Sequence, residues 1–281
     1  MTTGFGERVR AALAQYGPLC VGIDPHAALL DAWGLPQSGQ GVREFGLRTV
    51  AAAAGRAGVV KPQVSFFERF GSAGFAALED VLSAARAAGL LVIADAKRGD
   101  IGTTMDAYAA AWLTPGSPLE ADALTVSPYL GVGALDGTFA LAARHGKGTF
   151  VLAATSNPDA ADVQRSKDAE GRTVSAAIVA AVSQRNAADA PAGEWGGNGF
   201  VIGATVDWAE AGLEPFAPPA PILGPGFGAQ GAGPADLRAR YGSAARQVLA
   251  SESRSILSAG PAGLAEAIDR AAEGYREVLG E

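Results

Sequence analysis

The stretch Leu90-Leu-Val-Ile-Ala-Asp-Ala-Lys97 shows most clearly the pattern from which the fold class follows. Five apolar residues are followed by two charged residues that alternate with alanine, and the segment Arg98-Gly-Asp-Ile-Gly-Thr-Thr104 comes next. A short apolar run of this kind predicts a β-strand, and the apolar spacing of residues 101–112 predicts a helix directly after it. The stretch therefore indicates a strand that ends in charged residues and leads into a helix.

The same pattern recurs along the whole chain. Short β-branched or Leu-rich runs predict eight strands, at residues 19–24, 59–63, 90–97, 123–127, 149–155, 200–206, 221–225 and 247–250. Alanine-rich segments with helix-like spacing lie between them, mostly ending at Gly, at residues 42–56, 73–88, 101–112, 132–145, 173–188, 235–241 and 262–279. Strand, helix and strand repeated eight times imply parallel strands joined by right-handed crossovers. Eight such strands can close, so we expect an α/β protein with a single (β/α)8 TIM barrel.

One barrel domain is expected over residues 1–281, with two surface excursions. Residues 157–172 are polar and charged, and residues 187–198 are rich in Gly, Ala and Pro, so both exceed ordinary barrel loops. The alternative fold is a doubly wound open sheet. It is disfavoured because no Gly-x-Gly-x-x-Gly motif follows the first predicted strand, and the glycine-rich segment 224–233 follows the seventh.

Composition excludes several classes of function. The 281 residues are 48% hydrophobic and carry a net charge of −7, whereas general binding of nucleic acid requires a basic face. No apolar run reaches the roughly 18 residues of a membrane span, and the first residues lack the apolar stretch of a signal peptide. Cys20 is the only cysteine and lies in an apolar run, so we expect a buried, inert thiol and a cytoplasmic protein that contacts neither nucleic acid nor membrane.

Polar residues end the apolar runs, at the positions where the reactive groups of a barrel enzyme lie. They are Asp24, Lys61, Asp95 with Lys97, Ser127, Thr155 with Ser156, Gln230, and Arg254. Asp95 and Lys97 are two residues apart on a strand, so both side chains should point to the same side of it. Alternating charges can stabilise each other there, with Lys61 as the next cation. A purely structural ion pair at the barrel mouth is the alternative interpretation.

The run Asp95-Ala-Lys97-Arg-Gly-Asp100-Ile-Gly-Thr-Thr104 resembles the Asp-x-Lys-x-x-Asp-Ile-x-x-Thr signature of orotidine 5′-phosphate decarboxylases. Five further segments resemble motifs of that family in the same order: Val21-Gly-Ile-Asp24-Pro, Val60-Lys61-Pro-Gln, Leu152-Ala-Ala-Thr-Ser156-Asn-Pro, Gly224-Pro-Gly-Phe-Gly-Ala-Gln230-Gly, and Ser253-Arg254-Ser-Ile. The chain length and the two excursions are similar to the longer branch of the family. In the shorter branch the arginine usually follows a glycine, whereas Arg254 follows Ser253.

The resemblance implies that orotidine monophosphate is decarboxylated to uridine monophosphate without a metal or any other cofactor. It implies that Lys97 donates a proton to carbon 6 of the pyrimidine, beside Asp95 and Lys61. Asp24 and Lys61 would contact the ribose, Ser156 the pyrimidine, and Gln230 and Arg254 the phosphate. Asp100 and Thr104 would reach into the site of a second subunit, so the resemblance implies a homodimer with shared active sites.

Two other functions remain open at this point. Sugar-phosphate decarboxylases and aldolase-like synthases of the same barrel group share Asp-x-Lys-x-x-Asp but use Mg²⁺, held by an acidic ligand on the second strand. Here that position is Lys61, which repels a divalent cation. A non-catalytic phosphate-binding barrel would need Gln230 and Arg254 only. The two histidines, His26 and His145, form no metal-like pair, so no metal site is expected.

Overall fold

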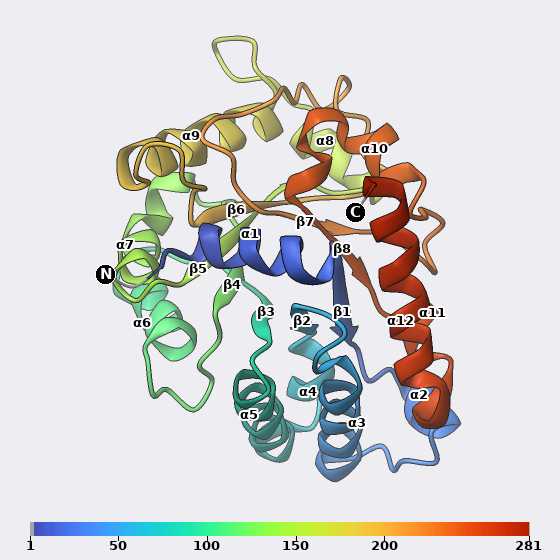
Figure 1. Ribbon diagram of the computed structural model, residues 1–281. Coiled ribbons are helices and arrows are strands. Elements are labelled where there is room, and N and C mark those ends of the chain that lie inside the picture. Colours follow the sequence, from blue (N-terminus) through green and yellow to red (C-terminus); the bar gives the residue numbers. More distant parts are fainter. Residues whose placement is uncertain (1–2, 281) are drawn as a thin grey trace.

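The computed structural model describes residues 3–280 and contains one closed barrel of eight parallel strands (Figure 1). Each strand pairs with the next along the chain, and β1 pairs with β8 to close the sheet. The strands are β1 (Leu19–Ile23), β2 (Val59–Pro62), β3 (Leu91–Arg98), β4 (Ala123–Val126), β5 (Gly148–Ala154), β6 (Asn198–Ile202), β7 (Ile222–Pro225) and β8 (Val248–Glu252). The predicted single TIM barrel is confirmed.

Helices surround the barrel and pack against the outer faces of its strands (Figure 1). The α-helices are α1 (Phe5–Tyr16), α2 (Ala27–Ala32), α3 (Gly39–Ala53), α4 (Ser65–Glu68), α5 (Gly71–Ala87), α6 (Gly102–Leu113), α7 (Asp136–Arg144), α8 (Ala161–Gln164), α9 (Val174–Asp189), α10 (Asp236–Tyr241), α11 (Arg254–Leu257) and α12 (Gly260–Leu279). Three 3₁₀-helices, η1 (Val132–Leu135), η2 (Pro158–Ala160) and η3 (Gly242–Gln247), complete the regular structure.

The sequence prediction was wrong at several boundaries. The sixth strand ends at Ile202 rather than at residue 206, because residues 203–206 form a turn closed by a hydrogen bond from Val206 N–H to the Gly203 carbonyl. The eighth strand continues to Glu252, and the excursion 157–172 contains η2 and α8. No helix forms in residues 203–221, which the structure describes in full, so the β6–β7 connection breaks the strand–helix repeat.

Strand alternation fills the inside of the barrel. Cys20, Val59 and Leu91 belong to one apolar cluster with residues of β4 to β8, and side chains of α1 join the same cluster: Phe5, Val9 and Leu13. The Phe5 ring meets the Phe150 ring edge to face, with centroids 6.0 Å apart. Helix α1, which sequence reasoning did not identify, therefore closes the end of the barrel at which the strands begin.

The same alternation carries polar groups to the other end of the barrel. Two residues beyond the apolar Val59 is Lys61, two beyond Ile93 is Asp95, and two beyond Leu249 is Ser251. Successive residues of a strand point to opposite faces, so these polar side chains share the inner face of the barrel with the apolar cluster that α1 joins. The mouth at the carboxyl ends of the strands is therefore charged, and this is the end at which barrel enzymes carry their active sites.

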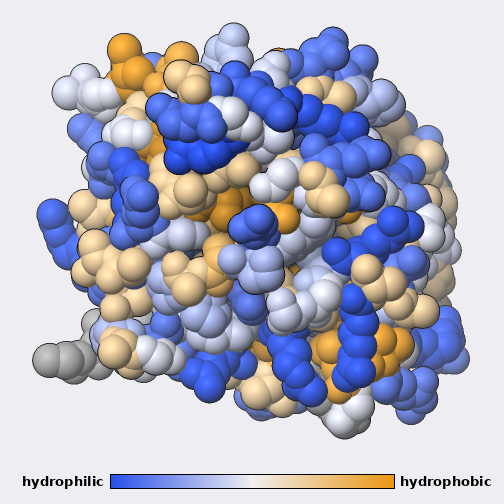
Figure 2. Space-filling view, turned by 90° about the horizontal axis from the view of Figure 1, so that it is seen from above, coloured by the Kyte–Doolittle hydropathy of each residue, from blue (hydrophilic) through white to orange (hydrophobic). Residues whose placement is uncertain are grey.

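No helix between residues 3 and 280 is both long and apolar enough to cross a membrane. Figure 2 shows one face of the molecule, on which hydrophilic residues predominate and apolar residues form separate small groups. Scattered apolar residues of this kind are ordinary on a protein surface.

Candidate active site

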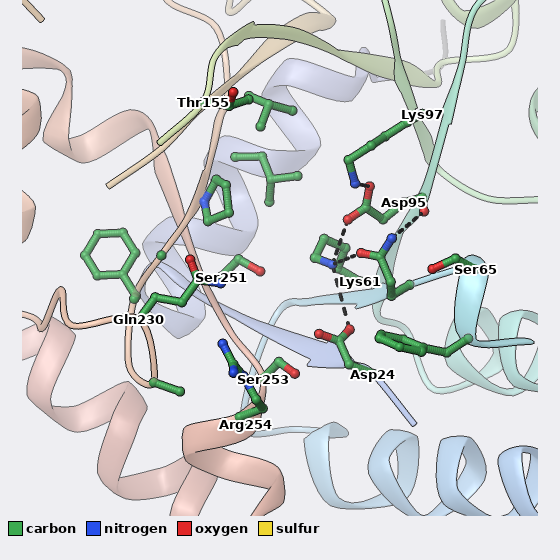
Figure 3. A pocket seen from close by; sticks show the side chains of 18 of the residues that line it. Asp24, Lys61, Ser65, Asp95, Lys97, Thr155, Gln230, Ser251, Ser253 and Arg254 are labelled. Carbon is green, nitrogen blue, oxygen red and sulfur yellow. Dashed lines mark hydrogen bonds and ion pairs between the residues drawn. The ribbon is translucent and has the colours of Figure 1, made fainter. Parts of the chain in front are cut away.

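A cavity of about 480 Å³ opens at the carboxyl ends of the strands (Figure 3). Seven of the residues singled out in the sequence line it, from six different strands or strand ends: Asp24, Lys61, Asp95, Lys97, Thr155, Gln230 and Arg254. A volume of this size is in the usual range for pockets that hold small molecules. The strand-end rule therefore located every Asp, Lys and Arg side chain of the cavity wall.

Asp95 lies at the centre of a chain of alternating charges. Its Oδ2 atom accepts a hydrogen bond from Lys61 Nζ at 2.9 Å, and its Oδ1 atom accepts one from Lys97 Nζ at 2.5 Å. Lys61 Nζ also lies 3.9 Å from Asp24 Oδ1 and donates to Gln63 Oε1 at 3.3 Å. The side chains of Asp95 and Lys61 are only 8% and 7% exposed, whereas that of Lys97 is 46% exposed and so accessible to a ligand.

Burial and charge pairing oppose each other in this network. Burial alone would raise the pKa of Asp95, but the ammonium groups of Lys61 and Lys97 hold it well below its usual range. Burial likewise acts to lower the pKa of Lys61, yet the carboxylates of Asp95 and Asp24 raise it above the ordinary value of lysine. All of these shifts favour the charged forms, so Asp95 is an anion and Lys61 a cation at neutral pH.

Lys97 has an unusual backbone. Its φ angle is +48°, in the left-handed region that residues with a side chain rarely adopt, and no other non-glycine residue of the described chain has a positive φ. The register between β3 and β4 shifts between Ala94 and Arg98. The expected meeting of Asp95 and Lys97 is observed, but it depends on this irregularity as well as on strand alternation. Such strain persists only where surrounding contacts hold it.

The opposite wall comes from β7, β8 and the segments that follow them. Figure 3 shows Gln230, Ser251, Ser253 and Arg254 across the cavity from Asp95 and Lys97. The Arg254 guanidinium forms no hydrogen bond or ion pair with any side chain of residues 3–280, and Ser253 Oγ is buried without a hydrogen-bond partner. This wall thus offers one cation and one hydroxyl that the protein itself does not use.

The glycine-rich loop of this wall packs very closely against β8 and α11. Gly228 has φ +70°, and a Cβ atom there would lie 2.2 Å from Ser255 Oγ and 2.6 Å from Glu252 Oε2. Glu252 is itself buried and accepts hydrogen bonds from Ser255 Oγ and Tyr275 Oη, each at 2.5 Å. Only glycine fits at this position, so the loop's main chain is held directly above the end of β8.

Ser156 and Thr155 divide between two cavities. Thr155 lines the main cavity, whereas Ser156 is exposed and lines a neighbouring cavity of about 160 Å³ that shares Thr155. Gln164 of α8 fixes Thr155: its Oε1 atom accepts from Thr155 N–H at 2.8 Å, and its Nε2 atom donates to Thr155 Oγ1 at 2.9 Å. Part of the excursion 157–172 therefore supports the wall of the site.

Asp100 and Thr104 do not line the cavity of their own chain. Asp100 Oδ1 accepts a hydrogen bond from Ile101 N–H at 2.8 Å, and Thr104 is exposed on α6. Ser127, another strand-end candidate, lies on the wall of a different cavity, near Tyr129. These residues are grouped at the rim beyond β3 and β4.

Sequence reasoning missed several cavity-lining residues: Gln63, Ser65, Phe66, Ser251 and Ser253. Strand alternation contained a signal for three of them, because Gln63 is two residues after Lys61, and Ser251 and Ser253 are two and four residues after Leu249. His26, treated as a loop histidine in the sequence, also lines the cavity, and its ring centroid lies 4.2 Å from that of Phe66.

Neither a metal cluster nor a reactive thiol is found in the described chain. Residues 3–280 contain no group of three or more His, Cys, Asp or Glu side chains placed to hold a metal ion. Cys20 is buried as predicted, and burial raises the pKa of its thiol to about 12. A thiol with that pKa is not a nucleophile at neutral pH.

Comparison with known proteins identifies the family. Residues 17–268 match the family model described as "Orotidine 5'-phosphate decarboxylase / HUMPS family". The orotidine 5′-phosphate decarboxylase of Salinispora arenicola is 52% identical over 277 residues, and that of Streptomyces coelicolor is 49% identical over 277 residues, with 98% of each chain covered in both cases. A crystal structure from Streptomyces avermitilis superimposes with a TM-score of 0.93 at 47% identity, covering 100% of this chain and 97% of the other. The chain belongs to the orotidine 5′-phosphate decarboxylase / HUMPS family.

Proposed function

We propose that this chain is a carboxy-lyase that converts orotidine monophosphate to uridine monophosphate and CO2, in de novo pyrimidine biosynthesis. The observation that carries the proposal is the row of alternating charges at the barrel mouth, in which the buried Lys61 and Asp95 are followed by the partly exposed Lys97. Full-length relatives at about half identity bear the name of this activity, which supports the same conclusion.

The chemistry requires a catalyst that stabilises a carbanion-like centre. When the bond between carbon 6 and the carboxylate breaks, its electron pair stays on carbon 6, where ordinary delocalisation is absent. A nearby ammonium stabilises that developing charge and then supplies the proton that forms the new C–H bond. Lys97 is suited to both steps, because it is the partly exposed cation of the network and is held by Asp95.

Asp95 destabilises the ground state, whereas Lys97 stabilises the transition state. Its carboxylate is ionised and lies next to the position proposed for the departing carboxylate, so it disfavours the charged ground state and holds Lys97 in place. Only interactions that change between the ground state and the transition state accelerate the reaction. Loss of CO2 removes the repulsion between the two carboxylates, which is a change of this kind.

The remaining cavity wall is assigned to the rest of the nucleotide. Arg254 and Gln230 would bind the phosphate, because the Arg254 guanidinium has no side-chain partner in the described part of the chain and the loops after the seventh and eighth strands are the usual phosphate site of these barrels. Asp24 and Lys61 would contact the ribose, and Asp24 Oδ1 has no hydrogen-bond partner among residues 3–280. Ser156 would contact the pyrimidine after a small shift from its neighbouring cavity.

A homodimer is part of the proposal. Four exposed apolar side chains surround the rim that carries Asp100 and Thr104: Ile101, Tyr108, Tyr129 and Leu130, with Tyr129 83% exposed. Burial of such side chains is favourable in a subunit interface. Twofold symmetry would make the exchange reciprocal, so that each subunit gives Asp100 and Thr104 to the site of the other.

The Mg²⁺-dependent branch of this barrel group fits the site less well. Lys61 Nζ lies between Asp95 and Asp24 and neutralises the two carboxylates that a divalent cation would need. A non-catalytic phosphate-binding barrel would have no use for the buried network. A cytoplasmic location also belongs to the proposal, in keeping with a lone, buried cysteine.

The first prediction is decarboxylation without metal. Purified protein should deplete the absorbance of orotidine monophosphate at the same rate before and after treatment with EDTA, because the cation at the second strand is Lys61. The product should be identified as uridine monophosphate by chromatography. Loss of activity on chelation that Mg²⁺ restores would instead assign the chain to the Mg²⁺-dependent branch.

The second prediction concerns the phosphate. Arg254→Ala should weaken binding of uridine monophosphate by roughly 10- to 150-fold, since a charge-assisted contact contributes about 1.5–3 kcal/mol, and binding of uridine should change far less. Calorimetric titration measures both affinities. Arg270→Ala, which removes an exposed arginine of α12, is the control. Equal losses for the nucleotide and the nucleoside would make Arg254 a structural residue.

The third prediction is complementation between inactive subunits. When Asp100→Ala and Lys97→Ala are mixed in equal amounts and allowed to exchange subunits, half of the dimers are mixed and each has one intact site of two. About a quarter of wild-type activity should therefore return.

The matched control mixes Asp95→Ala with Lys97→Ala. Both residues serve the site of their own chain, so no mixed dimer contains an intact site and activity should stay absent. If subunit exchange is verified by mass spectrometry and the Asp100→Ala mixture also stays inactive, Asp100 does not act in the neighbouring site.

A further inference from the structure

Thr125 is a completely buried residue of β4 that contacts both members of the Asp95–Lys97 pair. Its Oγ1 atom accepts a hydrogen bond from Lys97 N–H at 2.9 Å. The same oxygen lies 3.1 Å from Asp95 Oδ1 and 3.5 Å from the Ala94 carbonyl. One hydroxyl group thus joins the main chain of the lysine to the side chain of the aspartate.

The first of these contacts replaces a lost sheet interaction. In β3 and β4 the paired residues are Ala94 with Leu124 and then Arg98 with Val126, so residues 95–97 lie outside the regular register. A buried main-chain N–H without a hydrogen-bond partner destabilises a protein. The Thr125 hydroxyl accepts this N–H at the one residue whose φ of +48° places it outside the normal strand conformation.

The second contact completes the environment of the Asp95 carboxylate. A hydroxyl has one proton, and because Thr125 Oγ1 accepts from Lys97 N–H, it directs that proton to the nearer acceptor, Asp95 Oδ1. Asp95 then accepts from three donors: Lys61 Nζ, Lys97 Nζ and Thr125 Oγ1. Hydrogen bonds to the ionised form of a carboxylate stabilise that form and also fix its direction.

We propose that Thr125 is a positioning residue for decarboxylation, which holds the strained backbone of Lys97 and the carboxylate of Asp95 in one geometry through a single hydroxyl group. The proposal rests on the proposed function, because it assigns to Thr125 the placement of the proton donor. Thr125 does not line the cavity, so it acts through these two residues and not on the substrate.

The test compares two substitutions of similar shape. Thr125→Val keeps the volume and removes the hydroxyl, and Thr125→Ser keeps the hydroxyl and removes a methyl group. Thr125→Val should lower kcat by roughly 10- to 100-fold, because a misplacement of about 1 Å can change a rate that much. The KM for orotidine monophosphate and the affinity for uridine monophosphate should stay within about threefold, since the nucleotide contacts are untouched, and Thr125→Ser should recover most of kcat.

A matched control is available on the next strand. Thr149 of β5 is also completely buried and its hydroxyl donates to Asn198 Oδ1 at 2.9 Å, but it does not line the cavity. Thr149→Val should leave kcat within about threefold of wild type, although it removes a buried hydroxyl from the same sheet. If Thr125→Val does not fold, Thr125→Ala replaces it as the variant without a hydroxyl and is compared with Thr125→Ser in the same way.

The possible results distinguish a failure of the proposed function from a failure of the role assigned to Thr125. A wild-type protein that does not decarboxylate orotidine monophosphate would contradict the proposed function and, with it, the role of Thr125. An active wild type together with a kcat of Thr125→Val within threefold of it, or with equal losses of kcat for the Val and Ser variants, would overturn the role of Thr125 alone. Parallel losses of kcat, uridine monophosphate affinity and thermal stability would also overturn it, because they indicate a merely structural residue.

Discussion

The rest of the site depends on one interaction, the pairing of the buried Asp95 carboxylate with two ammonium groups. Without a partner, a carboxylate buried in this position would take up a proton and become neutral. A buried lysine without a partner would likewise lose its proton. With Lys61 on one oxygen and Lys97 on the other, both signs of charge are retained inside the barrel. This pairing places a permanent anion and a partly exposed ammonium at the same point, which is the combination that decarboxylation of an anionic pyrimidine requires.

The barrel places these groups by strand alternation. Inner-facing positions are apolar where the strands begin and polar where they end. One periodicity therefore produces both the apolar cluster covered by α1 and the charged mouth. The pairing of β3 with β4 is irregular between Ala94 and Arg98, and Lys97 within that interval has a left-handed backbone. Arg254 and Gln230 lie across the cavity, so the phosphate and the reacting carbon would be held by opposite walls (Figure 3).

Much of the fold was predictable because apolar runs and strand-end charges are local signals. The prediction extended the sixth strand through residues 203–206, since the β-branched Thr205 and Val206 are common in strands, but a turn ends it. Helix α1 escaped notice because its buried face has few residues, Phe5, Val9 and Leu13. The backbone of Lys97 and the contacts of Thr125 could not be predicted, because both depend on pairing with β4, whose Thr125 lies 28 residues after Lys97. The expected roles of Asp100 and Thr104 involve a second subunit, so they stay predictions.

The most direct test of the central claim is the single-turnover rate of orotidine monophosphate decarboxylation by Lys97→Ala, compared with wild type under saturating enzyme. Circular dichroism and thermal unfolding should show that the variant retains the barrel. The account predicts a decrease of several orders of magnitude in the rate, because the substitution removes the cation that stabilises carbon 6 and supplies its proton. A rate within tenfold of wild type would contradict it.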